Sequence, residues 1–505
     1  MPMNNNSRNY AIVDPSTQQP IPETMEFSLL TKSLAVIFFI WYLVVLTLAY
    51  NGFFEILMKF NRRSRHQMDI KIDDENLEGV TILRPLKGID PEMELCLESS
   101  FQQYYPNEKL EILFCVQDAN DPAVALAQHL INKYPKVDAK LLVDSDQSHK
   151  DNYGVNPKVN NLMKGYKSSK FDIIWICDSN VWARPDTLRR SVYSLVHSLD
   201  DGRFTKRPVK LVHHAPLAIS LSQHIMGAKL DEMFLSTSHC KFYVSLNKVA
   251  VAPCVNGKSN LYRKSDLNLA VSRIGEMAIQ PSLDGMSGDQ LRDAKYYSLL
   301  ENHGLAFFAR YIGEDNMIGI ALWNHCGGRT GLTGDCVMQP LGGQNSWIDY
   351  CLRRMRWLRV RKYMVLAATM LEPSTECLLC GVYGTFAVSV LFLGCGFNKM
   401  WFCMHVLIWF LTDYFQVHYL FQSVRDTSNI NSELLPYFLK ASFKLDANIP
   451  KLPGKRLISL RRFVPMWIMR EILALPIWIA AVVGSRVDWR GQPFKIKADL
   501  SAEAL

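Results

Sequence analysis

Acidic and amide side chains follow two apolar runs that have the character of buried strands. The run "IIWIC" precedes Asp178 and Asn180, and the run "LEILFCVQ" precedes Asp118. Open α/β sheets bind ligands at the carboxyl ends of their strands. Two acids with an Asp-x-Asn step suit a divalent cation, Mg²⁺ or Mn²⁺, bridging a diphosphate, because such cations prefer oxygen ligands. Taken alone, an Asp after a strand is more often an ordinary turn residue.

A second group of reactive side chains lies further along the chain. Glu314 and Asp315 precede a helix-like stretch, and "RRMRW" places Arg353, Arg356 and Trp357 just before an apolar region. Guanidinium groups suit a pyrophosphate because each can donate two parallel hydrogen bonds. The alternatives are a helix N-cap for either acid and a juxtamembrane basic and aromatic belt for "RRMRW".

Other chemistries find no support in the sequence. No GxGxxG motif follows the first expected strand and no GxxxxGK[ST] motif occurs, so dinucleotide and P-loop binding are unsupported. The 12 cysteines form no paired CxxC motifs, and we expect reduced, packed thiols rather than zinc ligands. The net charge of +8 comes largely from basic residues beside apolar segments, which favours a lipid headgroup surface over nucleic acid.

The elements that would position these side chains alternate between strand and helix. The expected strands are 79–88, 110–121, 138–144 and 171–178. The expected helices between them are 93–103, 122–134 and 156–166. This alternation is typical of an α/β domain with a mainly parallel sheet and right-handed crossovers. We therefore expect Lys87, Asp118 and Asp178 to line one crevice at the carboxyl ends of the strands.

Apolar segments at both ends of the chain predict membrane helices. They are 29–50, 377–397, 400–421 and 463–484. The last is weaker because Arg470 and Glu471 interrupt it, so it could pair these charges, snorkel or be re-entrant. Basic residues mark the cytosolic flanks. This places a catalytic domain, 60–370, in the cytosol, with the polar tail 1–28 and the tail 485–505 on the other side of a membrane domain, 371–490.

A series of motifs resembles a known enzyme family. The chain contains, in order, "PLKGIDPEMELCLESSFQQYYP", "CVQDANDPA", "GVNPKVNNLMKGY", "IIWICDSN", "LVHHAP", "TSHCKFY" and "RRMRW". These resemble the ceramide glucosyltransferases (glucosylceramide synthases), family 21 of the glycosyltransferases, over roughly 80–365 and weakly as far as "VDWRG" (487–491). Asp118, Asp178 and Asp315, followed by Arg353-x-x-Arg356-Trp357, are similar to the D, D, D, (Q/R)xxRW set of membrane-bound, family-2-like enzymes. The resemblance implies a GT-A fold and inverting glucose transfer from UDP-glucose to the primary hydroxyl of ceramide.

The resemblance also implies a role for each candidate residue. The donor would be bound by Pro85, Lys87, Asp118, Lys158, Asp178, Arg353 and Arg356. Asp178, with Asn180, would hold the Mg²⁺ or Mn²⁺, Asp315 would be the general base, and Glu314 would orient it or the sugar. The acceptor would lie near Trp357; His213 is a lesser candidate for the acceptor site and is about as well explained as a structural histidine.

Two other functions share the same residues. A processive polysaccharide synthase carries the same acids, but three C-terminal spans are few for a polymer channel, and Arg353 stands where polymer synthases usually have Gln. A catalytically silent membrane scaffold is the other. The segment 267–304 resembles an insertion, and with the long polar tail it indicates a fungal-type member, in the Golgi membrane, with homo-oligomerisation left open.

Overall fold

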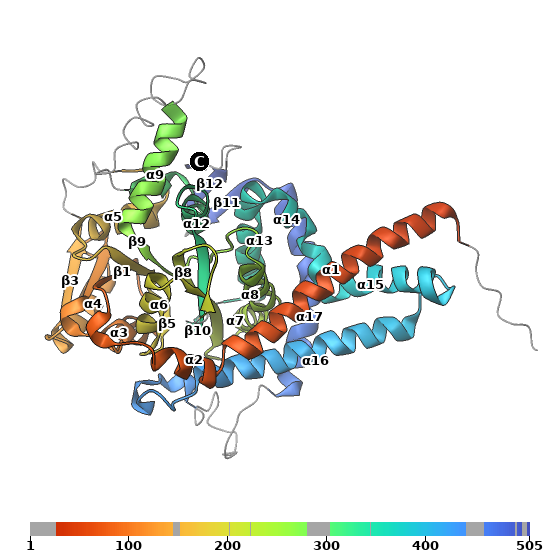
Figure 1. The fold of residues 1–505 in the computed structure, drawn as a ribbon, viewed down its shortest axis with the longest axis horizontal. Coiled ribbons are helices and arrows are strands. Elements are labelled where there is room, and N and C mark those ends of the chain that lie inside the picture. Colours follow the sequence, from red (N-terminus) through yellow and green to blue (C-terminus); the bar gives the residue numbers. More distant parts are fainter. Residues whose placement is uncertain are drawn as a thin grey trace, which may run out of the picture.

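The computed structural model describes most of the chain between residues 27 and 504. The described ranges are 27–144, 152–200, 203–222, 224–279, 304–343, 345–440, 459–489, 492–496 and 502–504. Most of the predicted polar tail 1–28 and most of the predicted insertion 267–304 therefore lie outside the described residues. The described part consists of a sheet unit and a group of long helices that projects from it (Figure 1).

The first half of the sheet is parallel, as the alternation of the sequence predicts. Its strands are β1 (Val80–Leu86), β2 (Leu110–Val116), β3 (Asp138–Val143) and β4 (Ile173–Cys177), in the spatial order β3-β2-β1-β4. The connecting helices are α3 (Met93–Phe101), α4 (Ala123–Lys133) and α5 (Pro157–Ser168). Their inner side chains are apolar and buried, because a parallel sheet is covered on both faces. The order brings the carboxyl ends of β1 and β4 side by side.

The second half of the sheet contains three antiparallel pairings. The order continues β4-β9-β8-β10-β5, where β9 (Ser259–Arg263) is antiparallel to both its neighbours and β5 (Trp182–Ala183) is antiparallel to β10. The long strands β8 (Val209–Ser220) and β10 (Arg329–Leu341) run parallel to each other. The sheet is thus mixed and mainly parallel, which confirms the predicted fold class.

Helices cover both faces of this sheet. They include α6 (Thr187–Val196), α7 (Met226–Phe234), α8 (Cys240–Val249), α9 (Lys264–Ile279), α11 (Gly304–Phe307) and α12 (Glu314–His325). One apolar cluster packs α3, α4 and α6 on the sheet, and another packs α5, α9 and α12 on it. The second cluster holds the first turn of α12 close to the end of β4, where the sequence predicts the reactive acids.

Three long helices lie together and project from the sheet unit (Figure 1). They are α1 (Leu29–Lys59), α15 (Cys377–Val388), which continues as a π-helical turn over Ser389–Leu393, and α16 (Lys399–Val424). Among the described residues, α1 and α17 (Leu460–Val483) are long and apolar enough to cross a membrane. The segments Leu366–Thr375 and Cys377–Leu393 pass this test only as one pair bent by 79°. The chain is a membrane protein, but three C-terminal spans are not confirmed.

Helix α17 is bonded to the sheet unit near both of its ends. Near its start, Arg462 forms an ion pair of 3.1 Å with Glu232 of α7. Near its end, Arg359 of α13 (Trp347–Met364) donates to the carbonyl of Ala480 at 3.0 Å, and Lys362 of α13 donates to that of Val482 at 2.9 Å. Helix α17 therefore runs alongside α13. The hydropathy of the sequence does not predict this packing of α17 beside α13, because hydropathy does not identify the elements that a helix contacts.

The chain after α17 returns to the sheet unit. It forms a small sheet of β11 (Arg486–Trp489), β12 (Gln492–Ile496) and β13 (Ala502–Ala504). The carbonyl of Arg486 accepts a hydrogen bond of 2.7 Å from Arg359 of α13. The described strand β11 therefore lies against α13 of the catalytic unit, a contact that the expectation of a tail at 485–505 did not include.

Candidate active site

A cavity of about 500 Å³ opens at the carboxyl ends of β1 and β4. Most of its polar lining comes from the loops after β1, β2 and β4, the loop before β9, and the helices α5, α12 and α13. The lining includes Pro85, Lys87, Gln117, Lys158, Asp178, Asn180, Asn256, Lys258, Glu314, Asp315, Arg353, Arg356 and Trp357. The crossovers of the sheet thus assemble in one place residues that are up to 272 positions apart (85 to 357).

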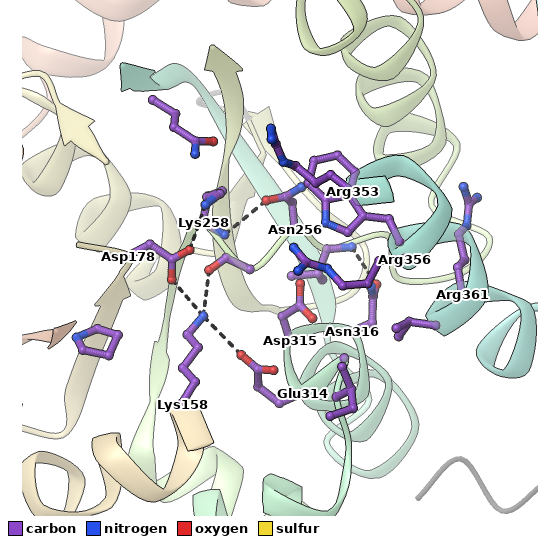
Figure 2. Close-up of a pocket in the computed structure, with 18 of the residues that line it drawn as sticks. Lys158, Asp178, Asn256, Lys258, Glu314, Asp315, Asn316, Arg353, Arg356 and Arg361 are labelled. Carbon is purple, nitrogen blue, oxygen red and sulfur yellow. Dashed lines mark hydrogen bonds and ion pairs between the residues drawn. The ribbon is translucent and has the colours of Figure 1, made fainter. Parts of the chain in front are cut away.

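Asp178 lies between two lysines at the end of β4. Its Oδ1 is 2.9 Å from Nζ of Lys158, in the first turn of α5, and its Oδ2 is 3.1 Å from Nζ of Lys258, in the loop before β9 (Figure 2). Burial acts to raise the pKa of Asp178, but the two ammonium groups outweigh it and lower this pKa to about 2. Asp178 is therefore a carboxylate at neutral pH.

Glu314 is held in place by groups on either side of it. Lys158 lies 3.1 Å from its Oε1, and Asn156, the N-cap of α5, donates to its Oε2 at 2.9 Å. Lys158 also donates to the carbonyl of Gly257 at 3.2 Å. Burial acts to lower the pKa of Lys158, but Asp178 and Glu314 together raise it, so the ammonium stays charged. Glu314 thus links α5 to α12 through charged hydrogen bonds.

Asp315, the next residue, has a different environment. Burial raises its pKa, the neighbouring Glu314 carboxylate raises it further, and the result is about 7. Its carboxyl lines the cavity, and Gly257 lies so close that a Cβ there would be 3.0 Å from Oδ2 of Asp315. A carboxyl that titrates near neutral pH at the wall of a cavity is suited to accept a proton from a bound hydroxyl.

The "RRMRW" residues lie on α13, which begins with a capping box between Ser346 and Asp349. Arg353 forms an ion pair with Asp231 of α7 and donates to Oδ1 of Asn345 at 3.0 Å. Arg356, one turn further, points into the cavity, where Nη1 lies 3.5 Å from the carbonyl of Asp488 in β11. Arg353 thus anchors the helix at the cavity wall, and Arg356 presents its guanidinium to the interior.

The same helix places an aromatic residue at the cavity. The ring of Trp357 lies 6.4 Å from that of Phe234, centroid to centroid. The guanidinium of Arg354, which the sequence did not single out, stacks 3.5 Å over the Phe234 ring and contacts Glu372 at 3.3 Å. The predicted position of Trp357 beside a sugar or acceptor is therefore open to a ligand on one side and packed on the other.

Two predicted site residues do not reach the described cavity lining. Asp118 lies in an exposed turn, where its Oδ1 accepts from the backbone N–H of Asn120 at 2.8 Å; the adjacent Gln117 lines the cavity instead. His213 is buried in β8, bonded to Tyr243 and, at 3.1 Å, to Asn247. Burial lowers the pKa of His213 to about 3, so it is a neutral structural histidine here.

The structure adds lining residues that sequence reasoning missed. Lys258 and Asn256 come from "NGKSN", a short polar run with no signal of its own. His239 and Tyr243 come from "TSHCKFY", a motif used above only for its resemblance. His239 ends a π-helical segment, Leu235–His239, and π-helical turns occur frequently at functional sites.

Comparison with known sequences gives the family. The sequence model of glycosyl transferase family 21 matches residues 40–275 and 295–502. The chain belongs to glycosyl transferase family 21. This family 21 glycosyltransferase is 55% identical to a ceramide glucosyltransferase of Komagataella phaffii over 484 residues, 94% of this chain and 92% of the relative. It is 48% identical to one of Candida albicans, over 95% of this chain and 99% of the relative.

More distant family members agree with this assignment. A ceramide glucosyltransferase of Gibberella zeae is 34% identical, over 92% of each chain. The family resemblance stated from the motifs is therefore confirmed, and these three relatives are fungal, as the long tail and the insertion indicate.

The predicted metal ligands of this glycosyltransferase, Asp178 and Asn180, are both bonded to lysine. Within the described ranges, no group of three His, Cys, Asp or Glu side chains is arranged to hold a metal ion. Both oxygens of Asp178 contact an ammonium group, and Oδ1 of Asn180 accepts from Lys258 at 3.3 Å. A cation at Asp178 and Asn180 would have to displace Lys258. This donor set, with both lysines in place, does not fit a metal ion.

Proposed function

We propose that this protein transfers glucose from UDP-glucose to the primary hydroxyl of ceramide, forming β-glucosylceramide and UDP. The observation that carries the proposal is the pairing of Asp315, a cavity-lining carboxyl with a pKa of about 7, with a set of cationic groups across the same cavity. The named relatives support the choice of substrates.

The donor would occupy the end of the cavity formed by the loops after β1, β2 and β4. Pro85, Lys87 and Gln117 line that end and are proposed to contact the nucleoside, with Asp118 at its outer edge. Arg356, with the lysines beside Asp178, would face the diphosphate. As the bond from the anomeric carbon to the diphosphate oxygen breaks, these cations would stabilise the negative charge that develops on UDP.

The acceptor would approach from the side of α13. Its hydroxyl oxygen forms the new bond to the anomeric carbon while its proton passes to Asp315, which acts as general base. Because the UDP oxygen departs from the opposite face of the carbon, the α-linked donor gives a β-linked product. Glu314, tied to Lys158 and Asn156, would orient the base rather than replace it.

The membrane helices would bring this cavity to the lipid acceptor. We propose that residues 60–370 form the catalytic unit on the cytosolic face of the Golgi membrane. Helix α14 (Leu366–Leu371), directly after α13, exposes Leu366 and Leu371 close to the cavity-lining Met364. An apolar surface beside the cavity suits an acceptor whose acyl chains stay in the bilayer while its hydroxyl enters the site.

Product analysis tests the proposal. The purified protein in detergent with UDP-glucose and a short-chain ceramide is expected to form one monohexosylceramide, whose β-linkage is read by nuclear magnetic resonance. The Asp315→Asn variant, prepared in the same way, is the control for catalysis at this site. A polymer or a ladder of products would support a polysaccharide synthase instead, and an α-linkage or no product would overturn the proposal.

A further inference from the structure

Two lysines from distant parts of the chain meet on one carboxylate at the donor end of the cavity. Nζ of Lys158 is 2.9 Å and Nζ of Lys258 is 3.1 Å from the two oxygens of Asp178. Figure 2 shows them reaching the carboxylate from two sides. Lys258 also donates to Oδ1 of Asn180 at 3.3 Å, so it contacts both residues that the sequence predicts as metal ligands.

The backbone holds the loop with Lys258 in this place. The backbone carbonyl of Lys258 accepts a hydrogen bond of 3.1 Å from the N–H of Asp178. The backbone N–H of Lys258 donates to Oδ1 of Asn256 at 3.1 Å. Between them, Gly257 accepts from Lys158 and passes close to Asp315. A larger residue at 257 would crowd Asp315. The loop 256–258 is therefore built into the site, and β9 begins directly after it.

The position of the two ammonium groups decides what can bind there. A Mg²⁺ ion needs oxygen ligands at about 2.1 Å, and at Asp178 it would meet two positive charges already within 3.1 Å of the same oxygens. An anionic diphosphate would instead be attracted to them. Lysine binds phosphate as a compact point charge and needs no fixed geometry to do so.

We propose that Lys258 binds the diphosphate of the sugar nucleotide in place of a divalent cation, and that Lys158, held beside it by Asp178, adds its positive charge to the same place. This inference rests on the proposed function, since it names how the donor of that reaction is held. On donor binding, Lys258 exchanges its contacts with Asp178 and Asn180 for diphosphate oxygens, while Asp178 keeps Lys158 in position. The leaving UDP then departs with its charge balanced by Lys258, Lys158 and Arg356, and no metal ion is consumed or required.

The test compares turnover and UDP binding with and without a chelator. Purified protein is stripped with EDTA, and ceramide glucosylation and UDP affinity are measured in EDTA and in Mn²⁺. The wild type is expected to keep turnover within about twofold in EDTA. Lys258→Met, which keeps the length of the side chain and removes its charge, is expected to lose about 10-fold to 100-fold in turnover and about tenfold in UDP affinity. Because this variant lacks the Lys258 ammonium group beside Asp178 and Asn180, Mn²⁺ can bind there and should restore part of the turnover and part of the UDP affinity.

The control is Lys164→Met, on the same helix as Lys158. Lys164 pairs with Asp144 at 2.6 Å, outside the cavity lining, so its variant should match the wild type in EDTA and in Mn²⁺. Wild-type turnover that disappears in EDTA and returns with Mn²⁺ would overturn the inference, and so would a Lys258→Met variant that binds UDP as the wild type does.

The two proposals fail in different ways. If the wild type forms no glucosylceramide in either condition, the proposed function fails, and UDP affinity in EDTA alone decides the role of the lysines. If Lys258→Met does not fold, binding of Mn²⁺ to the wild type with UDP, followed by electron paramagnetic resonance, takes its place. Protein-bound Mn²⁺ at one equivalent would contradict the inference, and an unchanged signal of free Mn²⁺ would support it.

Discussion

Adjacent acids in this cavity have opposite environments. Both carboxylate oxygens of Glu314 are engaged by charged or amide donors, and one of these donors is the ammonium of Lys158. Asp315 lies beside Gly257 and accepts from the backbone of Asn316, while burial and the Glu314 carboxylate raise its pKa to about 7. The difference in environment therefore supports the proposed roles, with Asp315 as the base and Glu314 as the residue that positions it.

Replacing Asp315 separates chemistry from binding. Asp315→Asn keeps the shape of the side chain and removes its basicity, so we expect turnover to fall by about 10²–10⁴-fold while UDP-glucose affinity changes little. Steady-state kinetics with a donor-binding titration measure both. Glu314→Gln should instead disturb Lys158 and weaken donor binding as well. Near-normal turnover in Asp315→Asn with a loss of donor affinity alone would make Asp315 a donor-site residue.

The titration of Asp315 predicts the pH dependence of the reaction. The base works only as a carboxylate, so kcat/KM should fall as the pH drops below about 7 and level off above it. The raised pKa also means that the folded state holds this proton more tightly than the unfolded chain. The contribution of Asp315 to stability therefore decreases as the pH rises from about 4, its ordinary value, to about 7. A pH profile of kcat/KM without an inflection between 6 and 8 would contradict this assignment.

At the scale of elements, a buried ionic cluster joins α15, α16 and α17. Arg470 of α17 pairs with Glu376 at 2.9 Å and with Glu471, and it donates to Oγ of Ser238 at 2.7 Å. Asp413 of α16 pairs with Lys241 of α8 at 2.7 Å. The charges that interrupt the apolar segment 463–484 are thus paired inside the protein, one of the outcomes that the sequence left open.

Breaking this cluster should destabilise the whole protein. Arg470→Met leaves Glu376 and Glu471 buried without their partner, which typically costs about 3–5 kcal/mol. We expect a clear drop in the midpoint of thermal unfolding in detergent. Arg462→Met removes a single ion pair on the same helix, and it should lower the midpoint less, because Glu232 keeps its hydrogen bond from the backbone N–H of Ser220. Equal midpoints for the two variants would show that the cluster contributes no more than this single pair.

For the molecule as a whole, the contacts of α17 and of the C-terminal strands fix which parts lie together. Both ends of α17 bond to the sheet unit, and β11 lies against α13. The part of the chain that projects away consists of the first half of α1, α15 and the first half of α16 (Figure 1). The sheet unit and the C-terminal strands should therefore face the same side of the membrane.

A protease experiment measures this arrangement. In sealed Golgi vesicles, external protease should digest both the catalytic unit and a tag at the C-terminus without detergent, while a tag at the N-terminus stays protected. Detergent, which exposes every site, is the control. Protection of the catalytic unit would contradict the cytosolic assignment, and protection of the C-terminal tag alone would show that α17 crosses the membrane.

The sequence by itself determined the family and the fold class, and it named ten of the residues that line the cavity. Local patterns carry this information: apolar runs alternate with amphipathic segments, and Asp178 and Asp315 stand at the ends of elements. The crossovers of a parallel sheet then bring the carboxyl ends of its strands to one edge, and this does not depend on the length or sequence of the loops between them. For this reason the strand pattern placed Lys87 and Asp178 in one crevice, although Asp118, the third residue expected there, lies outside the lining; Asp315 was placed by the family resemblance.

Only the tertiary structure decided which groups touch. Asp118 turns to solvent and His213 into the core, because side-chain direction depends on neighbours distant in sequence. Lys258 reaches Asp178 through the antiparallel pairing of β9 with β4, which no local pattern encodes. The course of α17 likewise depends on Glu232, Arg359 and Lys362, more than 100 positions away. Hydropathy measures the cost of leaving a segment in water, whereas these contacts depend on which partner the folded chain presents to it.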